Sequence, residues 1–455
     1  MRLEDHVAAR LRTVVPGAAD VCVGLSGGLD SVVLLDLLAC VAPPLGHRVS
    51  AVHVHHGLSP NADAWAALCA EACSARGVPL DVARVRVDRA APEGLEAAAR
   101  AARYAVYAAR TEAVVALAHH LDDQAETLLL QLLRGTGLRG AAAMPELRTL
   151  PGSAVRVFRP LLGVARDRLR EHALARGLAW AEDESNASLA MDRNYLRHEV
   201  MPRLDARFAG WRDAAARFAR HAAAADALLD DLARADGVTG APGEGLRVDA
   251  ALPAARRANA LRAFLAGAGL AMPGTARLAE MARQLYGARP DARVRIEHDG
   301  ATLVRQRGVV HIATGLAGHA RQPWRVAWGG ESEVDLGAGR GRVSFEPATG
   351  TGLAAPVDPI GDWHFAARSG GERLRLARGG HTRTLKNLLQ EAAVPEWQRE
   401  HLPLLYQGER LAWVPGIGVA AELACAPGCA GLLPRWRPGP ETAFGVAFGG
   451  HAVLE

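Results

Sequence analysis

Short apolar runs alternate with amphipathic stretches over the first part of the chain. Runs at residues 21–25, 49–54, 78–87 and 114–117 have the length and apolar character of strands. Helical spacing of apolar residues follows them, most clearly at Val32, Leu35 and Leu38. Strands that alternate with helices predict a parallel sheet with helices on both faces. We therefore expect an α/β domain over residues 1–205.

The pattern changes after this region. Residues 206–315 are rich in Ala, Leu and Arg with helical periodicity, and short alternating runs that suggest hairpins begin near residue 292, so we predict a mainly helical second domain. Residues 316–360 are rich in Gly and Pro and predict a linker with strands in it. Residues 361–440 are denser in apolar positions and predict a small α+β domain at the C-terminal end.

Composition narrows the class of protein. The chain has 455 residues, 49% of them hydrophobic, and a net charge of +4, which by itself does not indicate a nucleic-acid partner. No run of about 18 apolar residues is free of charges, so no membrane span is expected. The six cysteines include no C-x2-C pair, which makes zinc and iron–sulfur sites weak hypotheses and favours reduced thiols in a cytoplasmic protein.

The turn after the first predicted strand carries the first candidate chemistry. It reads S-G-G-L-D-S, and its backbone N–H groups, hydroxyls and following helix suit a phosphate group. Neither the G-x-G-x-x-G pattern nor a Walker lysine is present. Because Asp30 would need a cation beside phosphate, the loop predicts a non-Walker ATP·Mg²⁺ site; an ordinary strand-to-helix turn is the alternative. The predicted nucleotide contacts are Ser26, Gly27, Gly28, Leu29, Asp30 and Ser31.

Two further polar clusters follow later strands. Residues 53–57 read H-V-H-H-G, and residues 119–127 read H-H-L-D-D-Q-A-E-T. Ligands of open parallel sheets bind outside the carboxyl ends of the strands, so these clusters can meet residues 26–31 at one site. A metal cluster of histidines is conceivable, but hydrogen bonding or nucleotide packing is favoured, with His56 as a candidate adenine contact.

Several ordered blocks carry a family resemblance. Residues 26–31 resemble the PP-loop of ATP pyrophosphatases, whose fold is of the adenine nucleotide alpha hydrolase kind. Residues 94–104, 119–138 and 182–197 resemble one branch of them, the bacterial tRNA(Ile)-lysidine synthetases, and residues 373–390 resemble that family's small C-terminal domain. The resemblance covers roughly residues 18–205 and 365–420. The middle region matches in position more than in motif.

This resemblance implies a two-step ligase reaction. ATP adenylylates the wobble cytidine of a CAU-anticodon tRNA at carbon 2, through its oxygen, and pyrophosphate leaves. Free L-lysine then attacks through its amine and expels AMP, which gives lysidine and changes the tRNA from methionine-like to isoleucine specificity. The implied cofactors are ATP and Mg²⁺, the implied partners are tRNA(Ile) and lysine, and the family suggests a homodimer.

The resemblance also implies roles for the acidic and histidine residues. Asp30 would hold Mg²⁺ on the pyrophosphate, with Asp122 or Asp123 as a second ligand. The ammonium of lysine needs a carboxylate and a proton acceptor, which Asp122, Asp123 and Glu126 would supply, with His119 as a proton relay. Glu126 has an even alternative, since an acid in the first turn also favours the helix dipole.

Basic residues in three segments are predicted to contact RNA, because arginine suits phosphate and basic residues beside an aromatic suit a phosphate backbone. They are Arg100, Arg103, Arg193, Asn194, Arg197, Arg383 and Lys386, with Trp397 in the last segment. Solvated helix faces are the alternative for Arg193, Arg197 and the C-terminal segment. The second and third domains are accordingly expected to contact tRNA.

Two other functions remain as alternatives. A PP-loop tRNA thiolase needs catalytic cysteines near the nucleotide, commonly as C-x2-C, whereas Cys22 and Cys40 lie in apolar runs and Cys69 and Cys73 on a predicted helix. A non-catalytic RNA-binding protein could keep a nucleotide fold, but the intact set Asp30, Asp122 and Asp123 argues against it.

Overall fold

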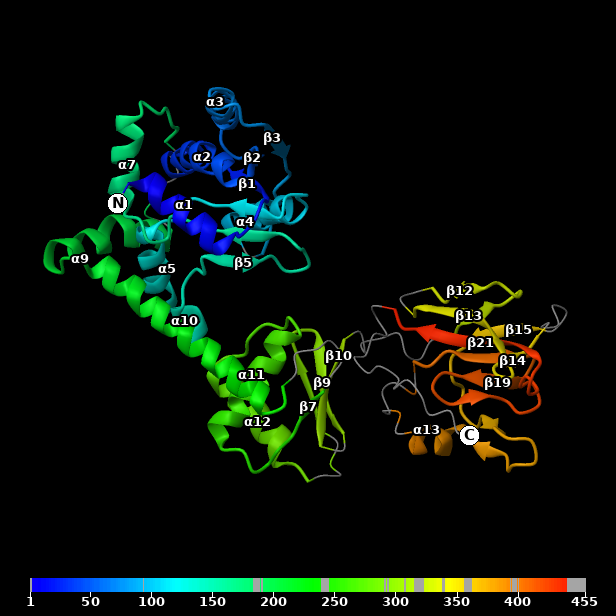
Figure 1. Cartoon of the computed structure of the whole chain (residues 1–455). Helices are drawn as coiled ribbons and strands as arrows, with labels where there is room; N and C mark the ends of the chain where they lie inside the picture. The colour runs from blue at the N-terminus through cyan, green and yellow to red at the C-terminus, as the bar shows by residue number, and fades with distance from the viewer. Residues whose placement is uncertain are drawn as a thin grey trace. The chain divides into compact units, whose positions relative to one another are not determined.

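The chain forms two compact units, Met1–Leu228 and Leu229–Glu455, in the computed structural model drawn in Figure 1. The structure describes residues 2–92, 94–182, 189, 191–238, 245–289, 292, 294–306, 308–314, 323–337, 340–355, 362–392, 394, 399 and 401–439. No helix among these residues has both the length and the apolar character to cross a bilayer.

The first unit contains the predicted alternation of strands and helices. Its elements are α1 (Leu3–Val14), β1 (Asp20–Gly24), α2 (Leu29–Val41), η1 (Pro43–Leu45), β2 (Arg48–His55), α3 (Ala62–Ser74), β3 (Leu80–Arg84), α4 (Leu95–Ala108), β4 (Val114–Ala116), α5 (Leu121–Leu133), α6 (Leu138–Ala141), β5 (Leu147–Thr149), β6 (Arg156–Phe158), α7 (Arg166–Ala175), α8 (Asp192–Tyr195), η3 (Leu196–Val200), α9 (Met201–Arg207) and most of α10 (Trp211–Ala235).

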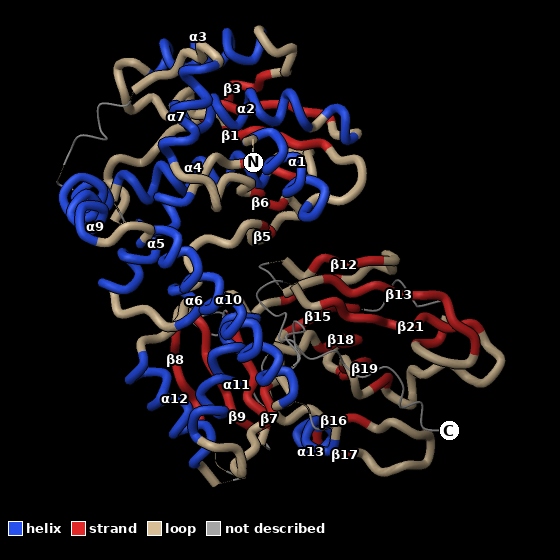
Figure 2. The backbone as a smooth tube through the Cα atoms, turned by 60° about the vertical axis from the view of Figure 1, so that its left-hand side comes forward, coloured by secondary structure: helices blue, strands red, loops and turns tan. Residues whose placement is uncertain are grey.

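The strands form one sheet in the order β3-β2-β1-β4-β6-β5 (Figure 2). Its pairs are parallel up to β6, and Val21 of β1 lies opposite both Val49 and Val114. The last strand, β5, runs antiparallel to β6. The sequence did not predict β5, because a three-residue edge strand with two exposed positions has no periodicity to detect.

The pleat of the strands sends side chains into two cores. Val21 and Val23 pack with α1, α2, α3 and α7 on one face, whereas Cys22 packs with Tyr107 of α4 on the other. Helices therefore cover both faces, as the alternating pattern predicted. Because helices cover the two faces, a ligand can reach the sheet at the carboxyl ends of its strands.

A buried carboxylate ties α7 to α2. Asp36 of α2 is 6% exposed and accepts hydrogen bonds from His172 Nε2 at 3.0 Å, Arg76 Nε at 3.0 Å and Arg176 Nε at 3.3 Å. Burial raises the pKa of Asp36, but these donors outweigh it and hold the pKa below its ordinary value. The C-terminal half of α7 is thus fixed to the helix that follows the PP-loop.

The second unit begins with a mixed segment. Helices α11 (Ala254–Gly267) and α12 (Thr275–Gly287) share a core with an antiparallel sheet in the order β7-β10-β9-β8. The strands are β7 (Leu246–Arg247), β8 (Val294–His298), β9 (Ala301–Gln306) and β10 (Val309–Thr314). The predicted hairpins after residue 292 are present, and helices supply most of the buried residues of this core, to which the sheet adds Leu246, Ile296, Leu303 and Val310.

The rest of the second unit is mostly antiparallel sheet. Its sheets have the orders β11-β15-β18-β19-β20, β12-β13-β21-β14 and β16-β17. The elements are β11 (Arg325–Ala327), β12 (Glu333–Asp335), β13 (Arg342–Thr349), β14 (Leu353–Ala354), β15 (Trp363–Ala366), β16 (Arg373–Leu374), β17 (Arg383–Thr384), α13 (Leu385–Glu391), β18 (Leu404–Gln407), β19 (Arg410–Val414), β20 (Gly418–Val419) and β21 (Ala430–Arg437).

Residues 316–360 were predicted to be a linker with strands in it, and the part of them that the structure describes contains strands that belong to a packed core. Strand β11 pairs with β15, β12 pairs with β13, and β13 and β14 pair with β21. Trp328 and Phe345 stack with ring centroids 3.9 Å apart inside a core. The glycines that suggested a linker instead lie in tight turns between these strands, with positive φ at Gly330, Gly337 and Gly341.

Candidate functional site

The PP-loop connects the end of β1 to the start of α2. Gly27 has a φ of +87°, and a Cβ there would lie 3.3 Å from the Sγ of Cys69, so the turn favours glycine. Ser31 Oγ accepts from the Ser26 N–H at 3.2 Å and donates to the Gly28 carbonyl at 2.9 Å, which holds the loop closed around the helix start. The Leu29 side chain is buried, so only its backbone can face a nucleotide.

Residues 119–123 meet this loop at the same sheet edge, around the ring of His120. Its Nε2 lies 3.6 Å from Asp30 Oδ2 and 3.4 Å from Asp123 Oδ2, and its Nδ1 lies 3.6 Å from Asp122 Oδ2. The side chains expected to converge from distant parts of the sequence are therefore adjacent. His120 itself was not predicted as a site residue.

The charges at this cluster are strongly coupled. Burial opposes the charge on His120, but hydrogen bonds and the charges of the surrounding carboxylates raise its pKa to about 10. Burial likewise raises the pKa of Asp122, yet His120, the Arg166 backbone N–H and Arg212 together bring it down to about 2. The pKa of Asp30 is lowered in the same way, against burial, by His120 and Arg166. At neutral pH Asp30 and Asp122 are therefore ionised and His120 is protonated.

Two arginines complete the surroundings of these acids. Asp122 Oδ2 accepts from the Arg166 N–H at 2.9 Å, at the N-terminus of α7, and Asp122 Oδ1 lies 2.7 Å from Arg212 Nε in α10. Arg166 Nε lies 3.7 Å from Asp30 Oδ1. Sequence reasoning missed both arginines. Arg166 could have been noticed in the sequence, because it is a cation in the first turn of a predicted helix. The helix dipole disfavours a cation there unless an anion lies close by.

Asp123 and Glu126 are engaged by the protein itself. Asp123 Oδ2 accepts from the His120 N–H at 3.0 Å in a capping box at the start of α5. Glu126 is 1% exposed and pairs with Arg193, through Nε, and with Arg197, whose Nε and Nη2 lie 3.0 and 2.8 Å from Oε2. The helix-dipole alternative alone does not explain a carboxylate buried between two arginines.

This arrangement changes the picture of the predicted RNA contacts in α8 and η3. Arg193 and Arg197 keep only 32% and 31% of their side chains exposed while pairing with Glu126. Asn194 is buried at 6% exposed, so its side chain does not face solvent as an RNA contact would need to. The acidic block 183–186, which precedes this segment, lies outside the described residues.

The predicted residues of α4 face the same site. Arg100 lies over the Tyr104 ring at 4.9 Å and donates to its hydroxyl at 3.3 Å, and Arg103 is exposed nearby. Burial first, then the charge of Arg103, lower the pKa of His56 to about 4. Both ring nitrogens of His56 are buried without a hydrogen-bond partner. His56 is thus a neutral ring with unsatisfied polar atoms at the end of β2.

Two of the acids are arranged in a way that suits a cation. Among the described residues no group of three or more His, Cys, Asp or Glu side chains is arranged to hold a metal ion. Mg²⁺, however, needs only one or two carboxylates when phosphate oxygens supply other ligands. Asp30 Oδ1 is buried with no hydrogen-bond donor, and Asp122 is ionised beside the same histidine. These two carboxylates fit a cation bound jointly with phosphate.

The cysteines do not form a reactive site. Burial raises the pKa of Cys22 and Cys73 to about 11 and that of Cys69 to about 12. A thiol is nucleophilic only as thiolate, so these groups are inert at neutral pH. The tRNA thiolase alternative therefore has no support in Cys22, Cys69 or Cys73.

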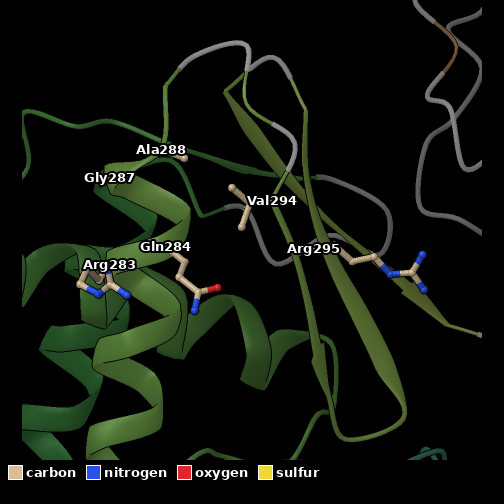
Figure 3. A pocket seen from close by; sticks show the side chains of 6 residues that line it. All are labelled: Arg283, Gln284, Gly287, Ala288, Val294 and Arg295. Atoms are coloured by element: carbon tan, nitrogen blue, oxygen red, sulfur yellow. The ribbon is translucent and has the colours of Figure 1, made fainter.

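A hollow of about 490 Å³ lies in the second unit between α12 and β8 (Figure 3). Its polar groups on α12 are already paired, because Arg283 and Gln284 both donate to Glu280. Figure 3 shows the Arg295 side chain directed away from α12, where it pairs with Glu297. Among the described residues that line the hollow, no polar side chain is left unsatisfied and none is a predicted site residue.

Two predicted RNA contacts lie on and before α13. Lys386 is exposed in its first turn, and Arg383 pairs with Glu391 at the other end of the helix. Trp397, predicted as their aromatic neighbour, lies outside the described residues.

Three family models match parts of this chain. Residues 3–204 match the family model of a PP-loop domain, residues 250–311 that of the TilS substrate binding domain, and residues 364–436 that of the TilS substrate C-terminal domain. A tRNA(Ile)-lysidine synthase of Azoarcus sp. (strain BH72) is 43% identical over 99% of both chains. The chain belongs to the tRNA(Ile)-lysidine synthase family. A relative of the same name from Burkholderia pseudomallei (strain K96243) is 43% identical over 94% of this chain and 95% of its own.

Membership of the tRNA(Ile)-lysidine synthase family confirms the predicted family and fold class and identifies the chain as a tRNA-modifying ligase that uses ATP through its PP-loop domain. Among solved structures, the U34-tRNA thiolase NcsA from Methanococcus maripaludis is 18% identical with a TM-score of 0.42, covering 48% of this chain and 77% of that one.

Proposed function

We propose that this chain joins free L-lysine to carbon 2 of the wobble cytidine in CAU-anticodon tRNA(Ile). ATP first adenylylates the cytidine oxygen with loss of pyrophosphate, and lysine then displaces AMP to give lysidine. The observation that carries the proposal is the meeting of the PP-loop with Asp30, Asp122 and Asp123 around one protonated histidine. The modified tRNA has isoleucine identity, so the reaction changes the specificity of the tRNA from methionine to isoleucine. We place this reaction in the cytoplasm.

The PP-loop is suited to hold the leaving pyrophosphate. Gly27 removes side-chain bulk from the turn, and the N-terminus of α2 directs backbone N–H groups and a partial positive charge at the anion. His56 is suited to hydrogen-bond the adenine, because its ring nitrogens are buried, uncharged and without another partner. Cytidine oxygen is a weak nucleophile, so positioning and charge neutralisation supply most of the acceleration.

Asp30 and Asp122 are the residues that would hold Mg²⁺ with the phosphates. Both remain ionised at neutral pH, since their pKa values are lowered. Mg²⁺, when bound, neutralises charge that develops on the departing pyrophosphate. Arg166 and Arg212 orient these carboxylates from α7 and α10.

The carboxylates beside the PP-loop are also suited to bind lysine, the second substrate. The ammonium of lysine needs an acidic surrounding and must lose a proton before its amine attacks. Both oxygens of Glu126 are engaged by arginines, so we assign it to positioning of α8 and η3. We assign ammonium binding to Asp122 and Asp123, which border the PP-loop, and the proton is released to solvent, because the lowered pKa of Asp122 suits it to stay an anion.

Contact with tRNA is assigned to basic side chains that remain accessible. Arg100 and Arg103 are exposed on α4, beside the nucleotide site, and suit the anticodon backbone. Arg383 and Lys386, which lie in the second unit, suit the phosphate backbone of the tRNA. Arg193 and Arg197 reach RNA only through the third of their surface that stays exposed.

The test is incubation of the protein with ATP, radiolabelled lysine and CAU-anticodon tRNA(Ile). We expect label in the tRNA only when ATP is present, with one AMP and one pyrophosphate released per lysine. D30N should abolish this incorporation while tRNA affinity stays within about twofold. D63N, which removes an exposed acid paired with Arg84, is the matched control and should retain activity. Unlabelled tRNA with the wild type, or full turnover by D30N, would contradict the proposal.

A further inference from the structure

Arg159 is a buried cation with no carboxylate partner among the described residues. It follows β6 directly and is 2% exposed. Its Nη1 donates to the Pro145 carbonyl at 2.8 Å, and its backbone N–H donates to the Glu146 carbonyl at 2.8 Å. A buried guanidinium without a counter-ion costs free energy. Packing alone therefore does not explain why a charged side chain is buried at position 159.

Arg159 also has a side-chain hydrogen bond with Tyr104 of α4, and a further contact reaches the predicted site. Its Nε lies 3.3 Å from Nδ1 of His119 and donates to it. A guanidinium has donors only, so Nδ1 must present its lone pair. The single ring proton of a neutral His119 then lies on Nε2, and the described residues offer Nε2 no hydrogen-bond partner.

The charges around His119 act in the same direction. Burial is the largest cause that lowers its pKa to about 4, and Arg159, Arg100 of α4 and Arg193 of α8 add to it, while Asp123 of α5 opposes them. The neighbouring residue, His120, has the opposite state, since its carboxylates keep it protonated. Two adjacent histidines in one sequence motif thus carry different charges.

We propose that Arg159 is a positioning residue that fixes His119 as the neutral tautomer with its proton on Nε2, so that His119 donates a hydrogen bond to a substrate oxygen. This inference rests on the proposed function for its chemical consequence. The acceptor class is an anionic or carbonyl oxygen at the reacting centre, either on the α-phosphate or on the cytidine. A ring held in this state cannot take the proton of lysine, so the proton-relay role expected from the sequence is replaced by one of donation.

The tautomer can be read without any turnover. In protein labelled with ¹⁵N-histidine, two-bond ¹H–¹⁵N correlation spectra distinguish a protonated from an unprotonated ring nitrogen. The His119 signals are assigned by their loss in H119Q. We expect an unprotonated Nδ1 and a protonated Nε2 in the wild type from pH 5.5 to 8.5. A proton on Nδ1, or titration of the ring within this range, would overturn the inference whatever the enzyme catalyses.

Kinetics of the adenylylation step test the role of the donor. H119A should lower kcat about 100-fold with little change in KM for ATP, as removal of one preorganised donor does. H119Q keeps an N–H near the position of Nε2 and should recover at least tenfold of that loss. Equal losses in H119A and H119Q would refute a donating role.

Arg159 is tested through the pH profile. R159Q removes the charge and the obligatory donor, so the acidic limb of the kcat profile should move up from about pH 4. It should stay below about 6.5, the ordinary pKa of histidine, because burial, Arg100 and Arg193 still lower the pKa of His119. R148Q is the matched control, because it removes an exposed arginine charge near Arg159 without a bond to His119. An unchanged profile in folded R159Q, or an equal change in R148Q, would refute the positioning role. Lack of lysine incorporation by the wild type would reject the proposed function but leave the tautomer result standing.

Discussion

Replacing Glu126 by Gln should weaken the first unit far more than an ordinary surface substitution. The carboxylate is 1% exposed and bridges α5 to the segment that carries Arg193 and Arg197. Gln keeps the shape of the side chain but turns an N–H donor toward a guanidinium. One of the two arginines then loses an anionic acceptor and faces a donor.

The size of the loss follows from the burial of the partners. Removing one member of a fully buried ion pair costs about 3–5 kcal/mol. Here about a third of each arginine side chain is exposed and can regain water, so we expect about 2–3 kcal/mol. For a unit that spans Met1–Leu228, this corresponds to a fall in Tm of about 5–10 °C.

The assay is thermal and urea unfolding of the full chain, followed by a probe in the first unit such as proteolytic cleavage near α5. E199Q is the control, because Glu199 forms an exposed pair with Arg203 and should change the unfolding free energy by less than about 0.5 kcal/mol. At 20 °C folded E126Q should still adenylylate tRNA within about tenfold of the wild type. An unfolding free energy equal to that of E199Q, or a 1,000-fold loss of rate in stable protein, would refute the positioning role.

Two further outcomes test the charges elsewhere. Glu112 accepts from Arg110 and from Ser50, and these bonds lower its pKa from 4.5 to about 2, so its contribution to stability is complete above pH 4.5 and is lost as the pH falls through about 2. E112Q should therefore be about 2 kcal/mol less stable than the wild type at pH 7 and nearly equal to it at pH 2 in urea titrations; a difference that stays constant with pH would contradict this sign. Replacing Arg383 and Lys386 together by Gln should weaken tRNA binding and flatten the slope of log K against log salt by about 1 to 2, with the smaller value expected because Arg383 also pairs with Glu391; an unchanged slope would remove this segment from the RNA interface.

The sequence was sufficient to predict where the site lies. Parallel strands end at one edge, so the polar turns after β1 and β4 had to meet, and they do so at Asp30 and Asp122. The sequence was not sufficient to separate His119 from His120. Both lie between a strand and a helix, where neither periodicity predicts the direction of a side chain. Their different states depend on Arg159 and on the acids, which only the fold brings close.

The fold was predicted where elements are long and periodic. Strands β1, β2 and β4 of the first unit were found because buried parallel strands are nearly uninterrupted apolar runs. The strands between Arg325 and Ala354 were assigned to a linker, because they are short and joined by glycine turns. Their pairing partners, β15 and β21, follow later in the chain, and local composition contains no information about such partners.

Helix α7 is held by hydrogen bonds at both of its ends. Its ten residues span about 15 Å. Asp36 clamps its far end through His172 and Arg176, and its near end presents the Arg166 N–H to Asp122. We therefore expect a change in the contacts of Asp36 to shift α7 and, with it, the Arg166 N–H that donates to Asp122. A variant of Asp36, which touches no substrate, is expected to change the orientation of the Asp122 carboxylate. A compensating substitution in α7 should restore that orientation.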